Sequence, residues 1–275
     1  MMERSEAPNL PTRPIEAGWL ALREPADARA RDAAADLLLP PLLTQLKHLD
    51  DDEAPRVVDL GAGTGANLRW LAPRLPHPER QRWTLVDHDP GLLARSPVHA
   101  TPLQADVIDL GDVLARTGEI DLITAAALLD LLDAQELAAI VSAVVEAGVP
   151  ALFSLTVDGF TALDPMDPDD PPLEAAFDAH QRRDGRLGPD AAAFTADLFR
   201  EHGRQVLEVP TSWRLDPAGG DAALVGSWLE GRAQAAVEHV PELRPTADAW
   251  LSRRAPGGLG LPRVLVGHVD LLALP

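Results

Sequence analysis

The stretch that decides the fold is Val57-Val58-Asp59-Leu60-Gly61-Ala62-Gly63-Thr64-Gly65. It begins as a short apolar run of the kind that forms a buried β-strand, and a helical pattern follows it at residues 66–71. The three glycines between them leave no Cβ along one side of the turn, so a ligand can lie against the backbone there. The helix behind the turn offers unpaired N–H groups. This arrangement is typical of the first strand of a doubly wound α/β sheet.

The rest of the chain alternates short apolar runs with helical patterns. We predict helices at residues 66–71, 91–94, 109–117 and 134–147. We predict strands at residues 56–60, 83–86, 101–105, 121–125, 151–157, 205–214 and 263–272. Apolar strands without a polar face need cover on both sides. We therefore expect a doubly wound, Rossmann-like α/β fold, in which helices cover both faces of a mostly parallel, seven-stranded sheet.

Three segments lie outside this alternation. Residues 15–46 carry a helical pattern, which we expect Pro40 and Pro41 to break. We assign residues 1–50 to an N-terminal helical segment and residues 51–275 to the main domain. Within the main domain, we expect a helical insertion at about 217–254 that forms a small cap. Residues 164–170 are rich in aspartate and proline, and we predict a mobile, solvated loop near a pocket mouth.

Composition excludes several classes of function. The 275 residues carry a formal net charge of −19, which disfavours nucleic acid and anionic membrane surfaces as partners. The chain has no cysteine, which excludes disulfides, thiolate catalysis and zinc–sulfur sites. The first twenty residues lack the apolar run of a signal peptide, and no uncharged apolar stretch has the length of a membrane span. We expect a soluble, cytoplasmic protein without a metal site.

The glycine spacing indicates which ligand the turn takes. A dinucleotide-binding turn places its third glycine five residues after the first. Here Gly65 comes four residues after Gly61, and Ala66 stands at the fifth position. Asp59, two residues before the first glycine, suits an ammonium group better than a pyrophosphate. Both features favour a cationic nucleoside that carries no phosphate.

The sequence resembles class I S-adenosylmethionine-dependent methyltransferases, whose first motif is an acidic residue followed by x-G-x-G-x-G. Further matches are Leu85-Val86-Asp87-His88-Asp89-Pro90, Ala105-Asp106-Val107 and Asp121-Leu122-Ile123-Thr124-Ala125-Ala126-Ala127-Leu128-Leu129-Asp130. The resemblance covers residues 56–157 and implies S-adenosyl-L-methionine as the cofactor. It also implies that the two late strands add an antiparallel pair, and that the N-terminal helical segment packs over the cofactor site.

In this family the acid after the second strand binds the ribose hydroxyls, which points to Asp87. Asp89, two residues on, competes for this role and could instead cap the next helix. The acid after the third strand binds the adenine amine, which points to Asp106, with the N–H of Val107 beside it. The leading helix can supply an arginine for the cofactor's carboxylate, Arg31 or Arg23; the alternative is a surface chain of ion pairs through Asp27. The residues expected to bind the cofactor are Asp59, Gly61, Ala62, Gly63, Gly65, Asp87, His88, Asp106, Val107, Ala125 and Arg31.

Candidate catalytic residues are Asp130, Asp158 and His180. The two aspartates follow the fourth and fifth predicted strands, at the sheet edge where such sites open; each could instead cap a helix or lie in a solvated loop. His180 could act as a base, or, with the arginines after it, complement a helix dipole. The other histidines show no metal spacing. Of Trp213, Trp228 and Trp250, which we expect in the core or a lid, one could contact substrate.

These residues predict a methyltransferase that transfers a methyl group to an O, N or C atom of a small molecule by in-line displacement. Positioning alone can supply much of the acceleration, so a general base is optional. The alternatives are a Rossmann-type NAD(P)-dependent oxidoreductase and a non-catalytic S-adenosylmethionine-binding protein. An RNA methyltransferase would need a basic face, against which the net charge argues.

Overall fold

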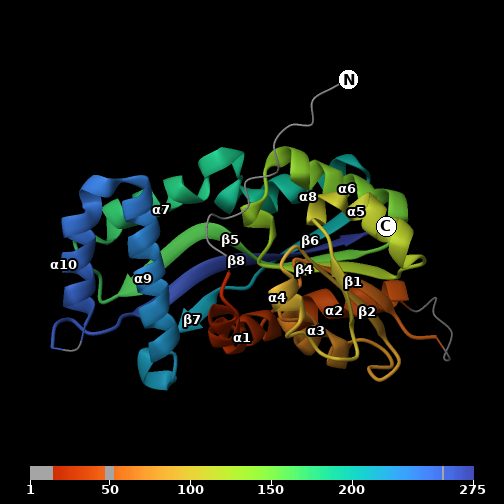
Figure 1. The fold of residues 1–275 in the computed structure, drawn as a ribbon, viewed down its shortest axis with the longest axis horizontal. Coiled ribbons are helices and arrows are strands. Elements are labelled where there is room, and N and C mark those ends of the chain that lie inside the picture. Colours follow the sequence, from red (N-terminus) through yellow and green to blue (C-terminus); the bar gives the residue numbers. More distant parts are fainter. Residues whose placement is uncertain (1–14, 47–52, 256) are drawn as a thin grey trace.

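The computed structural model describes residues 15–46, 53–255 and 257–275. Within them, one eight-stranded sheet has the order β3-β2-β1-β4-β5-β8-β6, and β7 pairs with β8 beside this path (Figure 1). The strands are β1 (Arg56–Leu60), β2 (Arg82–Asp87), β3 (Thr101–Gln104), β4 (Leu122–Ala126), β5 (Ala151–Asp164), β6 (Gln205–Pro210), β7 (Trp213–Leu215) and β8 (Arg263–Leu274). The predicted mostly parallel sheet is confirmed.

Strands β1 to β5 pair in parallel, whereas β8 runs antiparallel to β5, β6 and β7. The single late strand predicted for residues 205–214 is two strands. β6 pairs with one part of β8, from Val269 onward, and β7 pairs with another, up to Val266. The chain leaves the ladder at Pro210, which has no N–H to donate.

The fifth strand is longer than predicted. β5 continues past Val157 to Asp164, and pairs with β8 along most of its length, with irregularities near Phe153 and Val157. The prediction that Asp158 follows this strand is therefore wrong: Asp158 lies inside it, exposed to solvent. Pairing with a strand more than a hundred residues away extends β5, and a local pattern cannot indicate that extension.

Helices cover both faces of the sheet, as predicted (Figure 1). On one face the buried cluster includes residues of α5 (Leu110–Thr117), α6 (Ala134–Ala147) and α8 (Ala191–Glu201). On the other it includes residues of α2 (Ala35–Gln45), α3 (Ala66–Leu71) and α4 (Pro90–Leu93). Strands β1 and β4 contribute to both clusters, which explains their apolar runs.

The N-terminal region forms two helices, α1 (Ala17–Asp32) and α2. The prediction that Pro40 and Pro41 break the helical pattern is wrong, because both lie inside α2. Leu38 and Leu42, on either side of them, are buried against the sheet. This packing outweighs the local cost of the two prolines.

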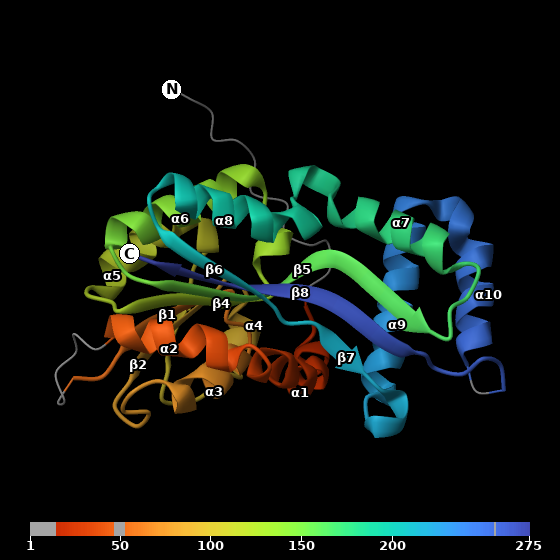
Figure 2. The same cartoon turned by 180° about the vertical axis from the view of Figure 1, so that it is seen from behind.

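A second helical group covers the outer halves of β5 and β8, at one end of the molecule (Figure 2). It consists of α7 (Asp170–Gln181), α9 (Ala222–His239) and α10 (Arg244–Arg254). The aspartate-rich segment before α7 is a largely exposed loop, as predicted, but two of its acids are not solvated. Asp167 is 3% exposed and pairs with Arg253 at 2.6 Å, and Asp170 accepts a hydrogen bond from Trp250. Arginines from a distant helix neutralise these acids, which the local sequence could not show.

Candidate functional site

The glycine loop joins β1 to α3. Gly61, Gly63 and Gly65 have φ values of +60°, +53° and +80°, which L side chains rarely adopt. A Cβ on Gly61 would lie 2.9 Å from the Leu128 side chain, and one on Gly65 would lie 2.7 Å from Pro97. The loop therefore needs glycine both for its conformation and for the close approach of its neighbours.

The acid at the end of β2 is tied to this loop. The Asp87 carboxylate accepts hydrogen bonds from the backbone N–H groups of Gly63 at 2.8 Å and Asp89 at 2.9 Å. Each oxygen keeps a further lone pair for a hydroxyl donor. Asp89 caps α4, accepting from the N–H groups of Gly91 and Leu92. The predicted role of Asp89 as the cap of the next helix is thus confirmed. The predicted role of Asp87 in binding ribose stays a prediction.

Five predicted cofactor residues border one cavity, although they come from the loops after three different strands. They are Gly61, Asp87, His88, Asp106 and Val107. The Asp106 carboxylate also accepts from the N–H of Ile108 and caps a short turn there. We call this cavity the nucleoside cavity. These five residues span about fifty positions of the sequence. The parallel topology brings them together at the carboxyl ends of neighbouring strands.

The nucleoside cavity is acidic. Besides Asp87 and Asp106, its border includes Asp133, Glu136 and Asp184, while Arg186 is its one arginine among the described residues. A diphosphate would lie against several carboxylates here. A sulfonium and an ammonium group would instead be attracted to them. The charge therefore favours a cationic nucleoside, in agreement with the glycine spacing.

Ala62, Gly63, Gly65 and Ala125 do not border the cavity. The first three belong to the glycine loop itself, where the N–H of Ala62 bonds to the carbonyl of Val86 at 3.0 Å. Ala125 lies on β4, is 1% exposed and packs in the hydrophobic core.

Asp59 and Arg31 belong to a buried polar network under the loop. Asp59 accepts from Asn67 Nδ2 at 2.7 Å, and Asn67 Oδ1 accepts from Arg31 Nη2 at 2.6 Å. Arg31 also stacks over the ring of Trp70 at 3.7 Å. The second carboxylate oxygen of Asp59 has no hydrogen-bond partner among the described residues. Burial raises the pKa of Asp59 to about 7 and lowers that of Arg31 to about 10.

The alternative of a surface ion-pair chain along α1 holds only in part. Arg23 pairs with Asp27 at 2.8 Å, and both side chains are mostly buried. Arg31 turns instead to Asn67, and it is 2% exposed. This face of α1 is therefore packed against the domain.

A second cavity, of about 540 Å³, adjoins the nucleoside cavity, and the two share Ile15, Ala127 and Leu131 on their borders. We call it the acceptor cavity. Its size is that of a small-molecule site. Its aromatic walls come from the five elements α1, β5, α7, β7 and α9. They consist of Trp19, Phe160, Phe177, Trp213 and Trp228.

Two arginines line the acceptor cavity, and each has a carboxylate partner. Arg23 pairs with Asp27 and lies over the Trp213 ring at 5.2 Å. Arg232 pairs with Glu174 and lies near the rings of Phe177, at 3.9 Å, and Trp228, at 4.5 Å.

Asp130, Asp178 and His268 also line this cavity. Burial raises the pKa of Asp130 to about 6, and burial and then Glu174 raise that of Asp178. Burial lowers the pKa of His268 to about 3, so its ring is neutral. His268 Nδ1 lies 3.1 Å from the carbonyl oxygen of Val266, which makes it the donor and leaves the lone pair on Nε2.

Of the three predicted catalytic residues, Asp130 borders the acceptor cavity. Asp158 accepts from the backbone N–H of Phe160 at 2.8 Å. His180 contacts Arg183, and its Nε2 lies 3.2 Å from Glu238 on α9. Asp158 and His180 line neither cavity. Sequence reasoning missed His268, Arg232, Asp178 and Phe177, which carry no motif and reach the cavity through the tertiary fold.

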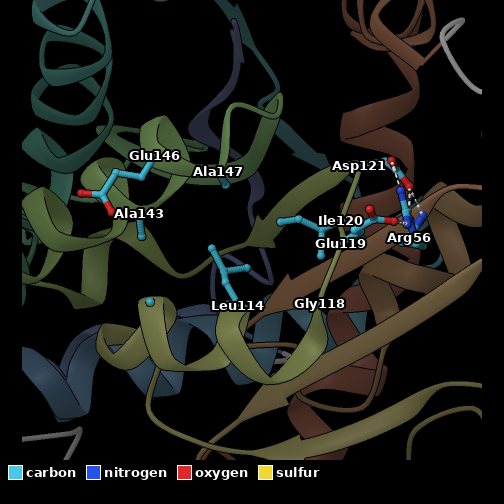
Figure 3. A pocket seen from close by; sticks show the side chains of 10 residues that line it. Arg56, Leu114, Gly118, Glu119, Ile120, Asp121, Ala143, Glu146 and Ala147 are labelled. Carbon is cyan, nitrogen blue, oxygen red and sulfur yellow. Dashed lines mark hydrogen bonds and ion pairs between the residues drawn. The ribbon is translucent and has the colours of Figure 1, made fainter.

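A third hollow, of about 590 Å³, lies near the amino ends of β1 and β4, and Figure 3 shows the residues that line it. Its arginine, Arg56, pairs with Glu119 at 2.5 Å and Asp121 at 2.9 Å. Doubly wound sheets bind ligands at the carboxyl ends of their strands, and this hollow is at the amino end of β1. We assign it no function.

Two further observations concern metal ligands and membrane spans. Across the ranges that the structure describes, no group of three or more His, Asp or Glu side chains is placed to hold a metal ion. In the same ranges, no helix has the length and apolar character that a bilayer crossing requires.

Comparisons with known proteins found one family model and solved structures to which the chain is similar. Residues 57–150, which include the glycine loop, Asp87 and Asp106, match the family model described as a methyltransferase domain. The chain is similar to a cyclopropane-fatty-acyl-phospholipid synthase-like protein from Lactobacillus casei, with 14% identity over 95% of this chain and 94% of that chain and a TM-score of 0.51. It is also similar to magnesium protoporphyrin IX methyltransferase from Synechocystis with bound SAH, with 11% identity over 96% and 89% and a TM-score of 0.49. No curated protein matches the sequence.

Proposed function

We propose that this chain is a class I S-adenosylmethionine-dependent methyltransferase that methylates a small molecule held in the acceptor cavity. The match of residues 57–150 to a methyltransferase-domain model and the similarity in fold support the proposal. The observation that carries the proposal is the junction of the two cavities at Ile15, Ala127 and Leu131. A methyl donor in one cavity and an acceptor in the other meet there. In-line displacement needs this placement more than it needs a particular catalytic side chain.

The residues present fit S-adenosylmethionine. In the proposal, the free lone pairs of Asp87 accept from the ribose hydroxyls, beside His88, and Asp106 accepts from the adenine amine, beside the N–H of Val107. The backbone of Gly61, Ala62, Gly63 and Gly65 supports the cofactor, with Ala125 in the strand beneath. When bound, this cofactor supplies an electrophilic methyl group.

The buried network under the loop supports a site for the amino-acid end of the cofactor. Asp59 holds an oxygen without a hydrogen-bond partner among the described residues, and Arg31 has such a nitrogen, its Nε. An ammonium group would satisfy the first, and a carboxylate the second. Buried groups of this kind are costly unless a ligand completes them.

The N-terminal segment belongs to the proposed cofactor site. In α1, the Leu20 side chain lies 3.0 Å from where a Cβ on Gly63 would stand. Glu24 of the same helix pairs with Arg69 of α3 at 2.6 Å. We propose that this helix covers the glycine loop and excludes water from it, and that residues 217–254 form a cap beside the acceptor cavity.

The formal net charge of −19 supports a small molecule rather than nucleic acid as the acceptor, and we propose a cytoplasmic enzyme. Titration calorimetry with S-adenosylhomocysteine and with NAD⁺ tests the cofactor. We expect S-adenosylhomocysteine to bind and NAD⁺ not to bind, because the nucleoside cavity is acidic. Binding of NAD⁺ alone would favour the oxidoreductase alternative and overturn the proposal.

A further inference from the structure

We infer that the acceptor is an organic amine with a flat, apolar body, which enters the acceptor cavity as a cation and places its ammonium group against Asp130. The inference rests on the proposed function, since it names the substrate class of the same site. It depends on how the charges around the cavity are paired, on the aromatic walls, and on the position of Asp130 beside the junction of the two cavities.

The arginines of the acceptor cavity are not free to bind an anion. Arg23 forms its ion pair with Asp27, whose other oxygen accepts from the Trp213 indole N–H at 2.9 Å. Arg232 is 9% exposed and is paired with Glu174. An anionic acceptor would have to break one of these partly buried pairs, which leaves a carboxylate without its cation.

The carboxylates that line the cavity are, in contrast, available. Asp130 and Asp178 form no ion pair with any residue that the structure describes. The cations that act on Asp130 are Arg23 and Arg186, but burial outweighs both and raises its pKa. A half-buried carboxylate without a direct ion-pair partner favours a ligand that brings a cation. The cavity therefore offers the acceptor two carboxylates that no described arginine pairs with directly, although Arg232 and Arg182 act on Asp178 from a distance.

The walls of the cavity suit the same ligand. Aromatic faces attract cations through their quadrupoles, most strongly where water is excluded. Trp19 and Phe160 border the cavity and form no cation–π contact with an arginine among the described residues. His268 is 3% exposed, and its Nε2 forms no hydrogen bond with a described residue. This nitrogen accepts and does not donate, so it also favours a ligand with N–H groups.

The position of Asp130 indicates which atom is methylated. In the sequence, Asp130 lies between Ala127 and Leu131, which border both cavities. Asp178 lies on α7 and borders the acceptor cavity alone. Asp130 takes one proton from the bound ammonium, and the freed nitrogen lone pair forms the new N–C bond. When bound, the cofactor would supply the methyl group: its methyl–sulfur bond would break with the electrons left on sulfur, and the positive charge would pass to the methylated nitrogen.

Three ligands that share one indole ring test the inference: tryptamine, a cation; tryptophol, which is neutral; and indole-3-acetate, an anion. Calorimetry measures their binding to the full chain, with and without S-adenosylhomocysteine. We expect tryptamine to bind about tenfold more tightly than tryptophol, because it gains an ion pair with a half-buried carboxylate. Indole-3-acetate should bind most weakly.

Asp130→Asn keeps the shape of the side chain and removes its charge. It should abolish the preference for tryptamine over tryptophol, and thermal melting checks that it folds. The matched control is Asp248→Asn, at an exposed position on α10, which should keep the preference.

Equal binding of all three ligands, tighter binding of indole-3-acetate, binding of none at millimolar concentration, or an undiminished preference in folded Asp130→Asn would each overturn the inference. Its failure is distinguishable from failure of the proposed function. A chain that binds S-adenosylhomocysteine but not tryptamine retains its cofactor assignment. A chain that prefers tryptamine but does not bind S-adenosylhomocysteine retains the amine site alone.

Discussion

The Asp87 carboxylate accepts a hydrogen bond from the backbone N–H of Gly63, 2.8 Å away. This bond joins the end of β2 to the glycine loop after β1, across 24 positions of sequence. It orients the carboxylate before any ligand arrives, and Asp87 is 5% exposed in this position. The acid and the loop therefore act as one preformed element of the proposed cofactor site.

Asp87→Ala should weaken the binding of S-adenosylhomocysteine by about 1–3 kcal/mol, because the ribose hydroxyls lose a buried acceptor. Calorimetry measures the change. Asp89→Ala is the comparison, since it removes the cap of α4 but no proposed ligand contact. It should lower stability and leave the dissociation constant near that of the wild type. An unchanged constant in Asp87→Ala, with a weakened one in Asp89→Ala, would move the ribose role to Asp89.

Gly61→Ala should destabilise the protein, by about 1–3 kcal/mol for the strained backbone alone. Its φ is +60°, and the new Cβ would lie 2.9 Å from Leu128. Gly111→Ala, in α5, has nothing within 4 Å of its Cβ and should be neutral or stabilising. Denaturant unfolding compares the two variants. Equal stability changes would show that the glycine loop is less constrained than described.

Asp59→Asn tests the buried network by the pH dependence of folding. Burial raises the pKa of Asp59 from 3.8 to about 7, so the folded state holds a proton that the unfolded state releases near pH 4. This contribution to stability is complete below pH 4 and is lost as pH rises through 7. Between pH 4 and pH 8, the wild type should lose on the order of 3 kcal/mol that the variant does not lose. Parallel stability curves for the two proteins would contradict the burial of an ionisable group at this position.

His180→Ala should leave the affinity for S-adenosylhomocysteine unchanged, and also the affinity for tryptamine. The reason is that His180 borders neither cavity and contacts Glu238 and Arg183 instead. Asp130→Asn, measured beside it, should affect tryptamine alone. If His180→Ala weakens tryptamine binding and Asp130→Asn does not, the acceptor would lie nearer to α7 than we propose.

Part of the border of the nucleoside cavity could be predicted from the sequence because the predicted residues lie in local motifs, whereas Asp184 and Arg186 reach it through the tertiary fold. The glycine spacing, Asp87 after one strand and Asp106 after the next each follow from a few consecutive residues. The parallel topology then places the ends of neighbouring strands at one edge. The antiparallel partner β8 was expected from the family resemblance, and its pairing with β5 and β6 agrees.

The acceptor cavity could not be predicted, because distant residues meet there without a pattern. His268 reaches it through the pairing of β8 with β5, opposite Val157. Arg232 looks like any arginine on a long helix, and only its contacts with Phe177 and Trp228 place it in the wall. The same long-range pairing keeps Asp158 inside a strand, where a local pattern predicted a strand end.

The most direct test of the central claim is a crystal structure of the chain with S-adenosylhomocysteine. We expect the ribose hydroxyls to lie within hydrogen-bond distance of Asp87, the adenine amine to lie against Asp106, and the sulfur to face Ala127 and Leu131. A ligand bound elsewhere, or one whose ribose makes no contact with Asp87, would contradict the central claim.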